Sequence, residues 1–127
     1  MKTLLIDAVK TFVNEDGKIF QELHDLLETF PNRKIIVTNA DYEKDNKFGL
    51  KDMPYEVFTL AHNPEKTDPQ YFKRLLEHFG LTPNEVIYFE HSPEAVKSAQ
   101  SVGIKSYYFN TQNKDLKALQ DFLVKNS

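Results

Sequence analysis

The stretch VIYFEHSPEAV, residues 86–96, joins the pattern of a buried strand to that of a helix start. Its first four residues are apolar, aromatic or β-branched, which is typical of a strand covered on both faces. Ser92 and Pro93 follow, and a serine before a proline is a strong signal for the first turn of a helix. Glu90 and His91 lie between the two patterns. The stretch therefore predicts a strand that runs directly into a helix, with titratable groups at the junction.

The same alternation of strand and helix extends along the chain in both directions. Asp68-Pro69 marks another helix start, and stretches with helical spacing of apolar residues separate the predicted strands. For the polar residues 41–52 we expect a short helix followed by a loop. Alternating strands and helices indicate a parallel sheet with helices on both faces, so the predicted fold is a three-layer, doubly wound, Rossmann-like α/β domain spanning residues 1–127. Five strands are predicted, at residues 3–9, 34–38, 55–60, 85–89 and 105–109.

Composition narrows the classes of function. The chain has 127 residues, of which 28% are charged, and its formal net charge is -3. Because no cluster of Lys and Arg exceeds two adjacent residues, we expect neither nucleic acid nor an anionic membrane as a partner. The apolar runs are far shorter than the roughly 18 residues that suggest a membrane span, and the N-terminus lacks a signal-peptide pattern, so the expected location is the cytoplasm. The absence of cysteine excludes a disulfide framework and thiolate catalysis.

Polar residues fall at the carboxyl ends of the predicted strands, which is where doubly wound sheets bind their ligands. Any one of them has a purely structural explanation, because strands must end in something polar. Together they would bring two carboxylates, a hydroxyl and an ammonium to one edge of the sheet, a combination that indicates a ligand site. In chain order these residues are Asp7, Thr38-Asn39, Lys66 and Glu90-His91.

Four segments resemble the motifs of the haloacid dehalogenase (HAD) superfamily of hydrolases. LLIDAVKTF, residues 4–12, resembles the first motif, a hydrophobic run followed by DxDGT, and IIVTN, residues 35–39, resembles the second. KTDPQYF, residues 66–72, is similar to the third-motif segment KPDPxxF, and residues 86–96 resemble the fourth, VxFVDDSxxNV. The resemblance spans nearly the whole chain and implies an HAD-like fold with Mg²⁺-dependent phosphoryl chemistry.

The resemblance also implies a role for each matching residue. Asp7 matches the nucleophile that attacks phosphorus to form an aspartyl-phosphate. Thr38 and Lys66 match the catalytic groups that hold the transferring oxygens. Mg²⁺ would be bound by Asp7, the backbone carbonyl of Val9 and Glu90, which stands where the family usually has a shorter aspartate.

Three positions depart from the motifs. Val9 replaces the second Asp of the first motif, which protonates the leaving group and activates water, and valine cannot transfer a proton. Because acid–base assistance is typically worth about 10²–10⁴-fold, we expect crippled turnover with phosphate binding retained. Lys10 replaces the motif glycine, and His91 replaces the second acidic residue of the fourth motif. Thr11 matches the motif threonine, and we expect it to bind substrate together with Asn39 and His91.

These departures leave two functions open. One is a weak or unusual Mg²⁺-dependent phosphohydrolase, and the other is a catalytically inactive HAD-like module that binds a phosphorylated ligand or a macromolecular partner. A receiver-like phosphoacceptor domain is disfavoured because the third strand ends in Thr-Leu-Ala, residues 59–61, without an acceptor Asp. A dehalogenase-like attack on carbon tolerates Val9 but needs a cap domain, for which the chain has no room. His62 is expected on a surface loop, and the sequence indicates no oligomeric state.

Overall fold

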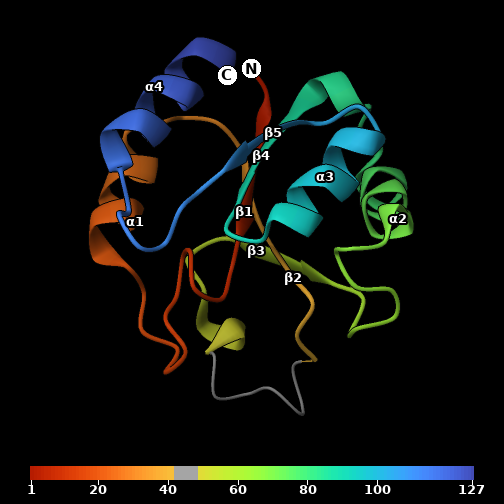
Figure 1. The fold of residues 1–127 in the computed structure, drawn as a ribbon, viewed down its shortest axis with the longest axis horizontal. Helices are drawn as coiled ribbons and strands as arrows, with labels where there is room; N and C mark the ends of the chain where they lie inside the picture. Colours follow the sequence, from red (N-terminus) through yellow and green to blue (C-terminus); the bar gives the residue numbers. More distant parts are fainter. Residues whose placement is uncertain (42–48) are drawn as a thin grey trace.

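The computed structural model describes residues 1–41 and 49–127, and in this part of the chain five parallel strands form one sheet (Figure 1). The strand order is β3-β2-β1-β4-β5, so the chain starts in the middle of the sheet and builds outward on both sides. This confirms the predicted doubly wound α/β fold. The strands are β1 Thr3–Asp7, β2 Lys34–Thr38, β3 Glu56–Thr59, β4 Val86–Glu90 and β5 Lys105–Tyr108.

Among the described residues, four α-helices cover the two faces of the sheet, with α1 and α4 on one side and α2 and α3 on the other (Figure 1). Two 3₁₀ turns, Leu50–Asp52 and Pro83–Glu85, complete the described elements. Residues 41–52 are predicted to form a short helix followed by a loop. Residues 42–48 lie outside the described part, so the 3₁₀ turn Leu50–Asp52 is the element that the structure describes in this region. The helices are α1 Gln21–Glu28, α2 Pro69–Phe79, α3 Pro93–Ser101 and α4 Leu116–Asn126.

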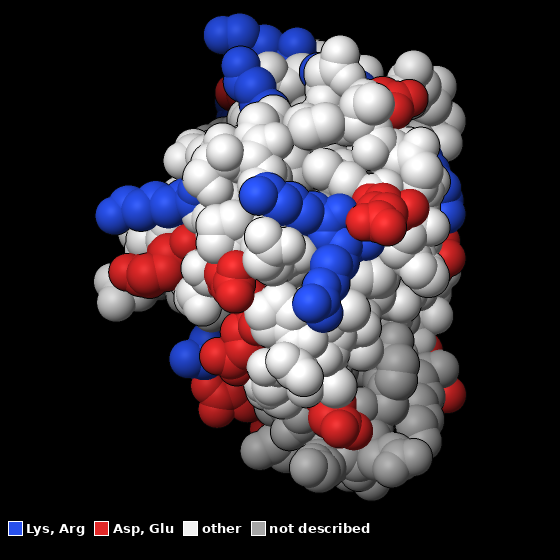
Figure 2. All heavy atoms as spheres, turned by 90° about the vertical axis from the view of Figure 1, so that its right-hand side faces the viewer, with Lys and Arg blue, Asp and Glu red and all other residues white. Residues whose placement is uncertain are grey.

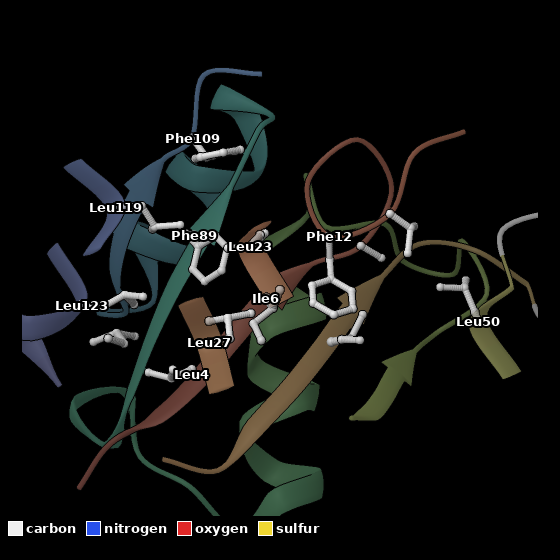
Figure 3. Close-up of a cluster of buried hydrophobic side chains, with 14 of the residues drawn as sticks. Leu4, Ile6, Phe12, Leu23, Leu27, Leu50, Phe89, Phe109, Leu119 and Leu123 are labelled. Atoms are coloured by element: carbon white, nitrogen blue, oxygen red, sulfur yellow. The ribbon is translucent and has the colours of Figure 1, made fainter. Parts of the chain in front are cut away.

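Side chains alternate between two cores along each strand, as the period of two requires. On the α1 and α4 face, the strand residues Leu4, Ile6 and Phe89 pack with Leu23 and Leu123 of the helices (Figure 3). The opposite core, under α2 and α3, contains the strand residues Leu5, Ile35, Val37 and Tyr88 and the helix residues Tyr71, Phe72, Leu75 and Ala99. Asp7 and Glu90 lie two residues beyond Leu5 and Tyr88, and they therefore point toward the α2 and α3 side at the carboxyl edge of the sheet.

The first strand is shorter than predicted. It ends at Asp7, because the backbone then turns: the amides of Phe12 and Val13 donate to the carbonyl of Ala8, at 2.8 and 3.0 Å. Lys10 has a φ of 74°, a left-handed conformation that a continuing strand excludes. The apolar pattern continues to residue 9 because the turn after the strand also packs on the core. Val9 forms an isolated bridge with Val13, and Val13 is a buried core residue.

The predicted caps hold the helices that flank the sheet edge. Asp68 accepts a hydrogen bond from the amide of Gln70 at 2.9 Å, and Ser92 accepts one from Ala95 at 3.4 Å. Each such cap typically contributes about 1 kcal/mol. The caps place the first turns of α2 and α3 at the carboxyl ends of the strands that precede them.

The surface and the helices add two observations. On the face seen in Figure 2, basic and acidic side chains are interspersed rather than gathered into a patch of one sign. No described helix is both long and apolar enough to cross a membrane.

Candidate functional site

A cavity of about 390 Å³ opens at the carboxyl edge of the sheet, between the ends of β1, β2 and β4. The two predicted carboxylates, Asp7 and Glu90, lie in its wall and are almost fully buried. Seven of the eight predicted site residues line this cavity, and the eighth, Thr11, is bonded to one of them. The lining includes Asp7, Val9, Thr38, Asn39, His62, Lys66, Glu90 and His91.

Lys66 bridges the two carboxylates. Its Nζ lies 2.6 Å from Asp7 Oδ1 and 2.7 Å from Glu90 Oε1, and the residue is only 6% exposed. Burial alone would lower the pKa of the Lys66 ammonium, but the charges of Asp7 and Glu90 outweigh burial and raise this pKa above its ordinary value. Lys66 is therefore a fixed buried cation.

The second oxygen of Asp7 receives three further donors. Thr11 Oγ1 donates to Oδ2 at 2.6 Å, the His91 amide lies 3.4 Å away, and His91 Nδ1 makes a short contact with the same oxygen. Burial would raise the pKa of the Asp7 carboxyl, but the Lys66 charge and the His91 hydrogen bond hold it well below its usual range. Asp7 is consequently ionised at neutral pH, which is the form that a nucleophile or a metal ligand requires.

His91 reaches both carboxylates with a single ring nitrogen. Besides the contact with Asp7, Nδ1 lies 3.1 Å from Glu90 Oε2. Burial lowers the pKa of this imidazole, yet its hydrogen bonds to the two carboxylates raise the value to about 9. The ring is a cation at pH 7, and 26% of its side chain is exposed toward the cavity side.

Glu90 is held by two groups in addition to Lys66 and His91. The amide of Ser92 donates to Oε2 at 3.1 Å, and the Tyr88 hydroxyl donates to Oε1 in a short contact. Burial and the adjacent Glu90 charge raise the pKa of the Tyr88 phenol, which keeps it a donor. The sequence analysis missed Tyr88. Its position two residues before Glu90 puts both side chains on one face of the strand, and this period was the available signal.

The remaining predicted residues hold the walls of the cavity. Thr38 Oγ1 accepts a hydrogen bond from the Ala40 amide at 3.1 Å. Its backbone is fixed by Tyr71, whose buried hydroxyl lies 2.8 Å from the Thr38 carbonyl and accepts from the Thr38 amide at 3.1 Å. Tyr71 is a second residue that the sequence analysis did not single out as part of the site, because an aromatic residue on a helix stripe is indistinguishable from ordinary core.

Asn39 ties the loop between β3 and α2 to the end of β2. Its carbonyl accepts from the His62 amide at 2.9 Å, and its Oδ1 accepts from the Lys66 amide at 2.7 Å. His62, expected to be a surface residue, is half exposed but also lines the cavity, and its Nδ1 lies 2.7 Å from Glu65. Asn39 thus orients the loop that carries Lys66.

Lys10 lies outside this cavity. Its exposed ammonium is 3.7 Å from Glu15, and it lines a separate hollow beside the loop before α1. The left-handed φ of 74° explains why the resembling motif has a glycine here, since glycine adopts this conformation without steric cost. The side chain lines that hollow and not the cavity that contains Asp7.

Comparisons with known proteins give a family match and several similar folds. Residues 1–109 match the family described as haloacid dehalogenase-like hydrolase. No curated protein sequence matches the chain. Among solved structures, an HAD family enzyme from Bacteroides thetaiotaomicron, in complex with magnesium and inorganic phosphate, is 17% identical with a TM-score of 0.74, and the match covers 94% of this chain and 98% of that one.

Two further structures have a similar fold. The D,D-heptose 1,7-bisphosphate phosphatase from B. bronchiseptica, complexed with magnesium and phosphate, is 12% identical with a TM-score of 0.71, over 100% of both chains. An HAD-superfamily hydrolase from Geobacter sulfurreducens is 13% identical with a TM-score of 0.69, covering 85% of this chain and 86% of that one. At these identities the similarity shows the shared fold.

Proposed function

Because the chain belongs to the haloacid dehalogenase-like hydrolase family, we propose that it is a slow phosphohydrolase that forms an aspartyl-phosphate on Asp7. The observation that carries this proposal is the state of that carboxylate. It lies in the wall of the cavity, it is ionised, and the buried Lys66 holds it in place at 2.6 Å. A carboxylate nucleophile needs this combination of charge and fixed orientation.

The residues present fit a divalent cation beside Asp7. Asp7 Oδ2 and Glu90 Oε2 both approach His91 Nδ1, so the two carboxylates converge on one point next to the cavity. Asp7, Glu90 and the carbonyl of Val9 would hold Mg²⁺, which similar structures from B. thetaiotaomicron and B. bronchiseptica contain together with phosphate. When bound, the ion supplies positive charge that neutralises the phosphate oxygens.

The protein residues account for one half of the reaction better than for the other. In the first half, an Asp7 oxygen bonds to phosphorus, the ester bond breaks, and the leaving oxygen keeps the electron pair and takes a proton from water. Lys66 offers a fixed positive charge to the transferring oxygens. In the second half, water attacks phosphorus, the bond between phosphorus and the Asp7 oxygen breaks, Asp7 keeps the electron pair as a carboxylate, and the water gives a proton to the solvent. Val9 lines the cavity where the family motif has its acid–base group, so this step proceeds without a protein base.

The substrate side of the proposal follows from the open cavity. We propose that residues 1–127 act as one core domain without a cap, which leaves the cavity accessible to a phosphate group carried on a large molecule. Asn39, Thr38 and His91 would contact the phosphorylated ligand, and Thr11 would keep Asp7 oriented through its 2.6 Å hydrogen bond.

Beryllofluoride, which imitates an aspartyl-phosphate, tests the site without a known substrate. With Mg²⁺ present it should raise the melting temperature by at least about 3 °C, because a ligand that binds only the folded state stabilises it by mass action. Asp7→Asn should abolish the shift, whereas Asp121→Asn, at an exposed position on α4, should keep it. A shift that survives Asp7→Asn would refute the proposal.

The inactive binding module is the second candidate, and one observation favours it. Both oxygens of Asp7 are already bonded, to Lys66 on one side and to Thr11 and His91 on the other. A protein that shows no beryllofluoride shift and does not hydrolyse phosphomonoesters would support this alternative. A search for a binding partner would then follow.

A further inference from the structure

We propose that His91 makes this site bind a nitrogen-preferring first-row transition ion, such as Zn²⁺, more tightly than Mg²⁺. The inference rests on the proposed function for the location of the metal and goes beyond it in naming the ion. It concerns the imidazole of this chain, which stands where the resembling motif has a carboxylate.

The three donor atoms are spaced for one metal ion. Within residues 1–41 and 49–127, ligand atoms of Asp7, Glu90 and His91 all lie within 4.8 Å of one another. Metal–ligand distances of about 2.0–2.2 Å place neighbouring ligand atoms roughly 3 Å apart. The 3.1 Å between His91 Nδ1 and Glu90 Oε2 already matches this spacing, and the shorter contact between His91 and Asp7 must open. The ion replaces the proton that Nδ1 now shares with the two carboxylates, and that proton is released to solvent.

The surrounding groups fix the ligands in place. Lys66 holds the opposite oxygen of each carboxylate, at 2.6 and 2.7 Å, and the Ser92 amide donates to Glu90 Oε2. Thr11 donates to Asp7 Oδ2. Such outer contacts orient metal ligands and strengthen binding. Asp7 and Glu90 are buried while His91 is partly exposed beside the cavity, which gives the ion a path of entry.

The type of donor decides which ion is preferred. Mg²⁺ takes oxygen ligands in a nearly ideal octahedron and gives up its water reluctantly. Imidazole nitrogen suits Zn²⁺, Ni²⁺ and related ions, whose affinity for mixed nitrogen and oxygen sites is intrinsically higher. A histidine in place of an acidic residue removes one hard, charged ligand and adds a nitrogen. Both changes weaken Mg²⁺ relative to Zn²⁺.

Metal titrations of the chelator-treated full chain test the preference. Zn²⁺ affinity is measured by competition with a chromophoric chelator and Mg²⁺ affinity by calorimetry, without substrate. We expect Zn²⁺ to bind at least tenfold more tightly. His91→Asp should weaken Zn²⁺ at least tenfold and strengthen Mg²⁺, whereas His78→Asp, which alters an exposed imidazole on α2, should leave both constants within about threefold.

Pulsed EPR of bound Mn²⁺ identifies the ligand directly in the wild-type protein. Nitrogen-14 modulation that disappears in His91→Asp supports the inference. Equal or tighter binding of Mg²⁺, absence of metal binding, or Mn²⁺ bound without nitrogen modulation would each overturn it, even if the variant failed to fold. A wild-type protein that shows the Asp7-dependent beryllofluoride shift but prefers Mg²⁺ contradicts only this inference. One that binds Zn²⁺ through His91 but never responds to beryllofluoride contradicts only the proposed function.

Discussion

Replacing Lys66 with methionine should expose how much of the stability depends on the buried ion bridge. Methionine keeps most of the side-chain volume and removes the charge, which leaves Asp7 and Glu90 facing each other. Their oxygens both lie within 2.7 Å of one nitrogen and are therefore at most about 5 Å apart, so the repulsion at that limit is a lower bound. Two unit charges at that distance repel by about 3 kcal/mol at an effective dielectric constant of about 20. Removal of one partner from a buried pair typically costs about 3–5 kcal/mol, so we expect a loss in that range at pH 7.

The pH dependence gives this prediction a sign. In the wild-type protein the pKa of Asp7 is depressed, so the carboxylate adds stability above its unfolded pKa, near 4, and loses it as pH falls through the folded value. Without Lys66, burial and repulsion by Glu90 push the pKa of Asp7 above its unfolded value, so the variant gains stability when Asp7 takes up a proton, and the difference in stability between the two proteins should shrink as pH falls from 7 toward 4. Urea unfolding with a chelator present measures both quantities.

A matched control separates the bridge from a general effect of removing a lysine. Lys73→Met, at an exposed position on α2, should change the free energy of unfolding by less than about 0.5 kcal/mol. A loss below about 1 kcal/mol for Lys66→Met at pH 7, or a loss that stays constant down to pH 4, would show that the carboxylates do not depend on this cation.

Three further substitutions test other parts of the structure. Lys10→Gly should stabilise the protein by about 1 kcal/mol in urea unfolding, because it relieves a left-handed φ and costs only an exposed ion pair with Glu15, and destabilisation would contradict the strain. Tyr71→Phe should cost about 1–3 kcal/mol, because buried backbone groups of Thr38 lose their partner, and a neutral result would mean that water replaces the hydroxyl. Val9→Asp should speed decay of the aspartyl-phosphate at least tenfold, as followed by loss of label, and an unchanged decay rate would show that the missing acid–base group is not what limits release.

The elements of the fold could be predicted because each leaves a local signal. The local signals are the apolar runs before Asp7 and Glu90 and the caps at Asp68 and Ser92, each of which is visible within a few residues. The rule that parallel strands bind ligands at their carboxyl ends then places the polar residues together. The predicted end of β1, at residue 9, was wrong. The apolar pattern continues into a turn whose residues are also buried, so burial alone does not separate the strand from the turn.

The hydrogen bonds and ion pairs among the site residues could not be predicted in the same way. The sequence indicates that Lys66 and both carboxylates share an edge, but not that one ammonium bonds to Asp7 and Glu90 together. That depends on the path of the loop before α2, which the hydrogen bond from the Lys66 amide to Asn39 Oδ1 fixes. The placement of His91 on both carboxylates likewise depends on a side-chain rotamer that no spacing rule specifies.

The balance of charges around the Lys66 bridge affects the rate at which a charged ligand reaches the site. At pH 7 the charges of Asp7 and Glu90 are balanced by those of Lys66 and His91, so the metal-free site presents almost no net field beyond its own wall. Electrostatic steering accelerates association only where a cleft carries charge of one sign, and salt slows such association by screening. An anionic ligand should thus reach the metal-free protein at an ordinary diffusional encounter rate that changes little with ionic strength. Its selection takes place after contact, through short-range bonds within the cavity.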